Sequence, residues 1–108
     1  MCEQVITITR MYTVKRTAEF DSWLANIKDG LTRIRLAKRL DKVQRGLLGD
    51  VEPVGEGVSE MREFFGPGWR MYYIERNDTI IVMLGGGEKS TQQADIAAAI
   101  ALSKSIEE

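Results

Sequence analysis

Two extended runs joined by a tight turn constrain the fold of this chain more than any other feature. The runs cover residues 58–65 and 69–76, and a Gly-Pro-Gly sequence at 66–68 separates them. Pro67 has the φ needed at the second position of a type II turn, and Gly68 accepts the positive φ needed at the third. The sequence therefore predicts a β-hairpin with its turn at these residues.

Each arm of this hairpin carries an arginine, Arg62 in the first and Arg70 in the second. Side chains alternate along a strand, so the two guanidinium groups converge if both fall on the same sheet face. Converging cations favour an anionic ligand. The alternative is a pair of surface ion pairs with Glu60, Glu63 or Glu75, which is common on an exposed sheet face.

The length and composition are those of one globular domain. A chain of 108 residues with 44% hydrophobic and 29% charged side chains builds a single hydrophobic core, so we expect one domain over residues 1–108. No apolar run is long enough to span a bilayer, and the first residues lack a signal-peptide pattern. With Cys2 as the only cysteine, these observations predict a cytoplasmic protein without an internal disulfide.

The chain has no histidine. This absence excludes imidazole acid–base catalysis, hydrolytic triads of the Ser-His-Asp kind and histidine-rich metal sites. We expect neither a metal nor a cofactor.

Hydrophobic periodicity predicts the elements outside the hairpin. Residues 4–12 are β-branched and alternating, as in a strand, and the apolar run 79–84 is typical of a buried inner strand. Amphipathic helices are predicted at 18–27 and 31–47, and the glycine-rich residues 46–57 are predicted to be a loop. With a C-terminal helix the order is β-α-α-β-β-β-α. This order predicts an α+β fold: an antiparallel sheet, the two N-terminal helices on one face, and the C-terminal helix beside it.

Individual residues predict where several of these elements begin or end. Thr17 is a suitable N-cap for the first helix. Asn77 and Asp78 both tolerate left-handed backbone and predict a two-residue turn between strands. Ser90 and Gln93 have the spacing of a capping box and predict the start of the C-terminal helix.

The second helix is strongly basic on one side. Residues 28–45 hold seven basic and two acidic side chains, a net charge of +5 within a chain of net charge −1. An apolar stripe of Leu36, Leu40, Val43 and Leu47 predicts the buried side. The opposite side carries the cations Arg35, Lys38, Lys42 and Arg45. It is either an ordinary solvated helix face or a surface for a polyanion or an acidic protein.

The glycine-rich sequence at 85–90 includes Lys89 and ends at Ser90. It departs from a nucleotide-binding P-loop, because Glu88 stands where that motif has glycine. Two interpretations stay open. The segment is either a plain, flexible strand-to-helix turn, or a set of backbone amides that favour an anion beside Lys89.

Five segments carry a resemblance to a known family through their joint order and spacing. They are Phe20-x-x-Trp23-Leu24, the basic helix from Ile34 to Leu40, Gly49-Asp50-x-x-Pro53-x-Gly55-x-Gly57-Val58-Ser59-Glu60-Met61-Arg62, Gly66-Pro67-Gly68-Trp69-Arg70-x-Tyr72-Tyr73 and Gly85-Gly86-Gly87-Glu88-Lys89-Ser90-Thr91-Gln92. In this combination the chain resembles the HigB-type "addiction module killer protein" branch of the RelE toxin superfamily. The resemblance covers nearly the whole chain and implies a RelE-like fold.

The resemblance also implies a function, the toxin of a type II toxin–antitoxin pair. Such a toxin is an endoribonuclease that cleaves messenger RNA, commonly on the translating ribosome, and a small helix-turn-helix antitoxin neutralises it. In the reaction a ribose 2′-hydroxyl attacks the adjacent phosphate, and cations that meet the growing charge stabilise the transition state. Neither a small-molecule cofactor nor a membrane is implied.

Carried over by position, the resemblance implies which residues form the site. Arg70 matches the arginine after the Gly-aromatic pair, Arg62 a basic position on the preceding strand, and Lys89 the basic residue after the last strand. We expect these three cations to lie within reach of one phosphate. Some relatives use a tyrosine or histidine of the final segment for proton transfer, and this chain has neither there. The carboxylates that remain as candidates for the base are Glu60, Glu88 and Asp95.

Two roles are open for the basic helix. In the endoribonuclease interpretation Arg35, Lys38, Lys42 and Arg45 bind messenger or ribosomal RNA backbone, with an affinity that falls as salt rises. The alternative is a non-catalytic protein-binding module whose basic helix docks an acidic antitoxin-like segment and modulates its binding to DNA.

Overall fold

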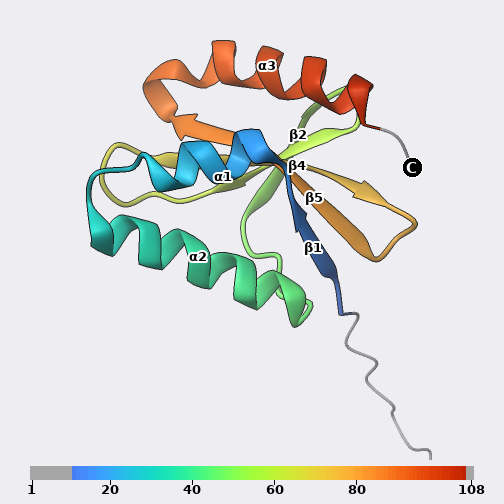
Figure 1. The fold of residues 1–108 in the computed structure, drawn as a ribbon, viewed down its shortest axis with the longest axis horizontal. Helices are drawn as coiled ribbons and strands as arrows, with labels where there is room; N and C mark the ends of the chain where they lie inside the picture. Colours follow the sequence, from blue (N-terminus) through green and yellow to red (C-terminus); the bar gives the residue numbers. More distant parts are fainter. Residues whose placement is uncertain (1–10, 107–108) are drawn as a thin grey trace, which may run out of the picture.

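The computed structural model describes residues 11–106 and shows one sheet flanked by helices (Figure 1). The strands are β1 (Thr13–Arg16), β2 (Val51–Gly55), β3 (Val58–Arg62), β4 (Trp69–Arg76) and β5 (Ile80–Glu88). The helices are α1 (Ala18–Ala25), α2 (Gly30–Gln44) and α3 (Gln92–Ser105), and a 3₁₀ turn covers Lys89–Thr91. Most of the strand predicted at 4–12 lies outside the described residues, and Met11 and Tyr12 precede β1. No helix in the described part is long and apolar enough to cross a membrane.

The sheet has the strand order β1-β5-β4-β3-β2 and is mixed rather than antiparallel throughout. β2, β3, β4 and β5 form an antiparallel series, whereas β1 pairs with β5 in parallel, with Thr13 opposite Ile80 and Arg16 opposite Met83. The prediction of a purely antiparallel sheet is wrong for β1. Its partner is distant in sequence, so no tight hairpin turn dictates its direction.

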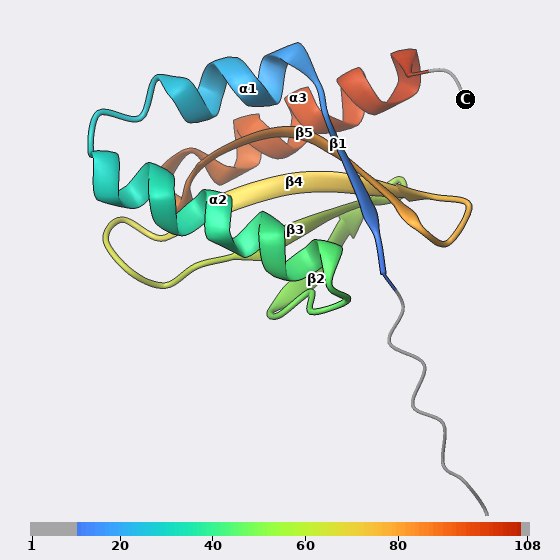
Figure 2. The ribbon, with the colours of Figure 1, turned by 60° about the horizontal axis from the view of Figure 1, so that its bottom comes forward.

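Two hydrophobic clusters lie on opposite faces of this sheet. Phe20 of α1 and Leu36 of α2 pack with Met83 on one face, and Ala99 of α3 packs with Tyr72 on the other. The first two helices share one face, as predicted, while α3 covers the opposite face (Figure 2). Because both faces are covered, the exposed side chains of the sheet lie at the ends of the strands and along the edge strands β1 and β2.

β2 occupies part of the segment predicted to be a loop. It pairs with β3, and the connection between them uses positive φ at Gly55, Glu56 and Gly57. Glycine and proline obscured this strand in the sequence. Proline has no N–H group to donate to a neighbouring strand. Pro53 is tolerated because β2 is an edge strand, with a neighbouring strand on one side only.

The glycine run of 85–87 is strand rather than a flexible exit, because β5 continues to Glu88 in register with β4. Packing explains the glycines at positions 86 and 87. A Cβ atom on Gly86 would lie 2.5 Å from the Trp23 ring, and one on Gly87 would lie 1.9 Å from Asp95 Oδ2. Side chains at these positions would therefore collide with α1 on one face and α3 on the other.

The helix ends follow the predictions in part. Thr17 caps α1 by accepting a hydrogen bond from Phe20 N at 3.1 Å, as predicted. The apolar stripe of α2 is buried except for Leu47, which lies beyond the end of the helix and is exposed. The predicted capping box at Ser90 is wrong, because the 3₁₀ turn intervenes and the N-cap Thr91 makes no side-chain capping bond.

Candidate functional site

The hairpin predicted from the sequence is present, but its turn is shifted by one residue. The closing hydrogen bond runs from Gly68 N to Phe65 O over 3.1 Å. Gly66, with φ 58°, is therefore the second residue of the turn and Pro67 the third. Gly68 has the expected positive φ, at 83°. The prediction that Pro67 takes the second position is wrong, because glycine supplies the left-handed backbone needed there.

The register of β3 and β4 places Arg62 opposite Arg70. Residues paired across an antiparallel ladder point to the same side of the sheet, so the expected shared face is observed. The guanidinium carbons of Arg62 and Arg70 lie 5.8 Å and 5.6 Å from the centroid of the Phe64 ring. Phe64 therefore lies beside both charges.

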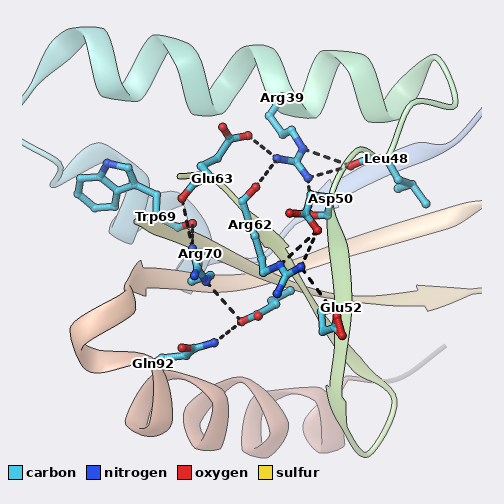
Figure 3. Close-up of polar contacts among 10 residues, drawn as sticks. Arg39, Leu48, Asp50, Glu52, Arg62, Glu63, Trp69, Arg70 and Gln92 are labelled. Atoms are coloured by element: carbon cyan, nitrogen blue, oxygen red, sulfur yellow. Dashed lines mark hydrogen bonds and ion pairs between the residues drawn. The ribbon is translucent and has the colours of Figure 1, made fainter. Parts of the chain in front are cut away.

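Arg62 is bound by carboxylates outside the hairpin. Its Nη2 and Nε atoms donate to Asp50 Oδ1 at 2.9 Å and 3.2 Å, and Glu52 Oε2 lies 3.9 Å from Nη2 (Figure 3). The hydrogen bond to Asp50 is the main cause that raises the pKa of Arg62 above its usual value. Arg62 therefore forms ion pairs, as the alternative interpretation predicted. Its partners are Asp50, just before β2, and Glu52, in β2, and the predicted partners Glu60, Glu63 and Glu75 are wrong for this arginine.

Arg70 is buried, with 5% of its surface exposed. Its Nη1 atom donates to the backbone oxygens of Glu63 and Trp69 at 3.2 Å and 3.1 Å, and its Nε lies 3.9 Å from Glu60 Oε1 (Figure 3). Glu60 is 3% exposed and accepts a hydrogen bond from Gln92 Nε2 of α3 at 2.8 Å. The open sheet face expected from the sequence is therefore closed here by the first turn of α3.

Lys89 lies in the 3₁₀ turn after β5 and is exposed. Its backbone N donates to Gly68 O at 2.8 Å, which attaches this turn to the hairpin. A methyl group built on Gly68 would lie 3.3 Å from Lys89 Cβ and 3.6 Å from Arg70 Nη1, so both basic residues flank the hairpin turn. Within residues 11–106 no ion-pair partner neutralises the Lys89 ammonium group.

Arg62, Arg70 and Lys89 therefore form a cation arc around the hairpin. Arg70 is in the middle, next to Arg62 at the Phe64 ring and next to Lys89 at Gly68. The Lys89 end is exposed and uncompensated, and the Arg62 end is about one-third exposed and paired with Asp50. An anion in solvent contacts Lys89 and the exposed part of Arg62 directly. The buried charge of Arg70 attracts the anion only through its electrostatic field.

The three carboxylates considered as a base lie in different surroundings. Glu60 is buried beside Arg70, and Asp95 accepts a hydrogen bond from Thr91 Oγ1 at 2.6 Å. Glu88 pairs with Trp69 in the sheet register and lines a cavity of about 420 Å³ next to that tryptophan. Residues 11–106 contain no group of three or more His, Cys, Asp or Glu side chains able to hold a metal ion.

Tyr72 lies next to the cation arc, opposite the Glu60 that neighbours Arg70. Its hydroxyl is buried and has no hydrogen-bond partner within residues 11–106. Burial, followed by the charges of Glu60 and Asp95, raises the pKa of Tyr72 far above its ordinary value of 10. Tyr72 therefore stays neutral across the physiological range.

This raised pKa predicts a loss of stability in alkali. Above about pH 10 the tyrosine ionises in the unfolded chain but not in the folded one, so the free energy of unfolding falls by up to ~1.4 kcal/mol per pH unit. Below that pH the group is protonated in both states and contributes no slope. Tyr72→Phe is expected to reduce the fall in the free energy of unfolding above about pH 10, as measured by urea denaturation at several pH values. A part of the fall remains in this variant, because the pKa of Tyr73 is also raised. An unchanged alkaline slope in Tyr72→Phe would contradict the assignment.

The basic face of α2 is present and borders a small cavity. The cavity measures about 210 Å³ and is lined by Arg35, Lys38, Arg39, Lys42 and Glu63. The Arg35 guanidinium lies 3.6 Å from the centroid of the Phe65 ring, which fixes its position against the hairpin loop. Arg45 is the C-cap of α2 and is exposed beyond this cavity.

Arg39 is a central residue that the predicted set of site residues omits. It is buried, and it donates to the backbone oxygens of Leu48, Asp50 and Arg62 and to the carboxylate of Glu63 (Figure 3). It thereby joins α2 to the segment before β2 and to the hairpin. The sequence does contain a signal, because position 39 falls within the buried helical stripe of α2, where an arginine needs partners.

The chain is similar in sequence to an uncharacterized protein of Haemophilus influenzae, with 36% identity over 93 residues that cover 86% of this chain and 94% of that protein. No protein-family model matches the chain. In fold it is similar to a chain of the toxin–antitoxin complex RelBE2 from Mycobacterium tuberculosis, with a TM-score of 0.62 and 17% identity over 77% of this chain and 97% of that chain. This likeness confirms the predicted RelE-like α+β fold. At 36% identity over most of both sequences, the chain belongs to the same family as the Haemophilus influenzae protein.

Proposed function

We propose that this chain is the toxin of a type II toxin–antitoxin pair, of the HigB-type branch, and cleaves messenger RNA. The fold supports the proposal, because it is similar to that of a chain from a toxin–antitoxin complex. The observation that carries it further is Lys89, an exposed and uncompensated cation held next to Arg70 at the hairpin turn. This combination suits a phosphate at the surface of the β3–β4 hairpin.

The proposed reaction is attack of a ribose 2′-hydroxyl on the adjacent phosphate, which leaves a cyclic phosphate on one fragment and a hydroxyl on the other. Negative charge grows on the phosphate oxygens in the transition state. Lys89 and the exposed part of Arg62 contact these oxygens. The buried charge of Arg70 stabilises the same negative charge electrostatically, because little water lies between them to screen it. Binding at Arg62 requires the RNA to compete with Asp50 for the guanidinium group.

Glu60 contributes to this site through Arg70. Its carboxylate is buried, bonded to Gln92 and 3.9 Å from Arg70 Nε, so it holds the guanidinium group in place. In this proposal Glu60 is a positioning residue, and the contact between α3 and β3 that Gln92 provides is part of the site.

The exposed cations of α2 form the second contact with RNA. Arg35, Lys38 and Lys42 border one cavity, with Arg45 at the end of the helix. We propose that they bind RNA backbone on the ribosome, and that a helix-turn-helix antitoxin is the protein that neutralises the toxin.

The proposal is tested by the products of purified protein on messenger RNA, both free and on translating ribosomes. We expect fragments that end in a 2′,3′-cyclic phosphate, and no cleavage at a position where the ribose is replaced by 2′-deoxyribose. The deoxy substitution removes the attacking hydroxyl but keeps every phosphate. The substituted RNA therefore keeps its phosphate contacts with the protein, so a loss of cleavage reports on the chemistry and not on binding. Cleavage that persists at the deoxy position would contradict the proposed chemistry.

A second candidate is a non-catalytic protein-binding module, favoured by one observation. Arg70 is buried and Arg62 is paired with Asp50, so two of the three cations are already engaged. This candidate is preferred if messenger RNA stays intact under both conditions while the protein binds a DNA-binding partner through α2.

A further inference from the structure

Phe64 is a large aromatic residue left in water at the centre of the proposed site. It lies between β3 and β4 and is 70% exposed. All other aromatic residues within 11–106 are buried or partly buried, including its neighbour Phe65. Burial of an aromatic ring is strongly favourable, so an exposed ring at this position offers a broad apolar face to a ligand.

The surroundings of this ring are specific. The guanidinium carbons of Arg62 and Arg70 lie 5.8 Å and 5.6 Å from its centroid, within the range of cation–π contact. The same two arginines belong to the cation arc. A ligand bound here therefore meets a flat apolar surface and positive charge side by side.

We propose that Phe64 stacks a nucleobase of the RNA next to the phosphate held by the cation arc. This inference rests on the proposed function, because it names which part of the substrate the ring contacts. A nucleotide joins a flat π face to an anion, the two features that this surface presents together. An apolar anchor from a protein partner would use the ring but make no use of the positive charge beside it. Stacking also tolerates every base, so Phe64 positions the RNA without reading one base by hydrogen bonds.

The test measures binding of a 2′-O-methyl RNA decamer, which keeps its bases and phosphates but has no free 2′-hydroxyl. An abasic decamer with the same backbone is the matched ligand. Phe64→Leu keeps an apolar side chain and removes the π face. We expect it to weaken binding of the base-bearing decamer by about fivefold or more, within the range that base–aromatic stacking gives, and to leave the abasic decamer unchanged. Phe64→Trp is expected to retain binding.

Salt dependence separates stacking from charge. Phe64→Leu should lower the affinity at every salt concentration without changing the slope, whereas loss of one phosphate contact changes the slope by about 0.7 for a single strand. Met11→Ala is the control, because Met11 is similarly exposed, at 65%, and lies just before β1, whose pairing with the start of β5 is at the end of the sheet opposite the hairpin turn. It should leave both decamers unaffected.

Each remaining outcome decides between the proposals. If Phe64→Leu weakens both decamers equally, or weakens neither, the stacking role is overturned even where the protein cleaves RNA. If Phe64 is needed for the base-bearing decamer but messenger RNA is never cut, the stacking role stands and the endoribonuclease proposal fails. If the wild type binds neither decamer, the stacking role is overturned, and the cleavage assay on translating ribosomes alone decides the endoribonuclease proposal.

Discussion

Replacing Arg39 by methionine is expected to lower the free energy of unfolding by about 3–5 kcal/mol, the usual cost of breaking a buried ion pair by removing one partner. Methionine preserves the length and apolar volume of the side chain but donates no hydrogen bond. The carboxylate of Glu63 and the backbone oxygens of Leu48, Asp50 and Arg62 then lose their shared donor. Urea denaturation at neutral pH measures the effect.

Two further variants make this experiment specific. Lys42→Met removes an exposed charge from the same helix, and its effect should stay within about 0.5 kcal/mol. The double variant with Arg39→Met and Glu63→Gln should recover part of the loss, because the unpaired carboxylate is then neutral. A loss below about 1 kcal/mol in Arg39→Met would show that water replaces the arginine at little cost.

Lys89→Ala is expected to reduce kcat/KM for RNA cleavage by about 10²- to 10³-fold, the loss typical when one preorganised donor to a developing oxyanion is removed. The side chain is exposed, so the free energy of unfolding should stay within about 0.5 kcal/mol of the wild type. Cleavage assays under single-turnover conditions measure the rate, and expression without the antitoxin gives the same ranking through growth arrest.

Lys104→Ala is the matched control for this prediction. Lys104 is also exposed, and it pairs with Glu56 at 2.9 Å, at the far end of α3 from Lys89. Its removal should leave cleavage unchanged. Wild-type cleavage by Lys89→Ala would exclude Lys89 from the site.

The sequence predicted most reliably the features that depend on local physical chemistry. Thr17 caps its helix, Asn77 and Asp78 form a left-handed turn, and the stripe of Leu36 to Val43 is buried because each follows from neighbouring residues. The predictions failed where a distant partner decides the outcome. β1 is parallel because of its pairing with β5, and residues 85–87 are strand because they pair with β4, with α1 packed against Gly86 and α3 against Gly87.

The same distinction applies to the site. Alternation along the strands allowed Arg62 and Arg70 to share a face, and the register of β3 and β4 places them there. It gave no indication that Asp50 would bind Arg62, or that the first turn of α3 would close over Glu60 and bury Arg70. Such contacts join segments far apart in the chain, and a pattern of residue types carries no information on their distance.

The parallel pairing of β1 with β5 has a consequence for biosynthesis. β1 is the first of the described strands to leave the ribosome, yet its partner β5 is the last of them, so β1 cannot join the sheet until β5 has been synthesised. At roughly 5–20 residues per second, β1 stays unpaired for seconds during elongation. The sheet therefore closes only after β5 has emerged from the ribosome, and a nascent chain stalled before β5 cannot complete it.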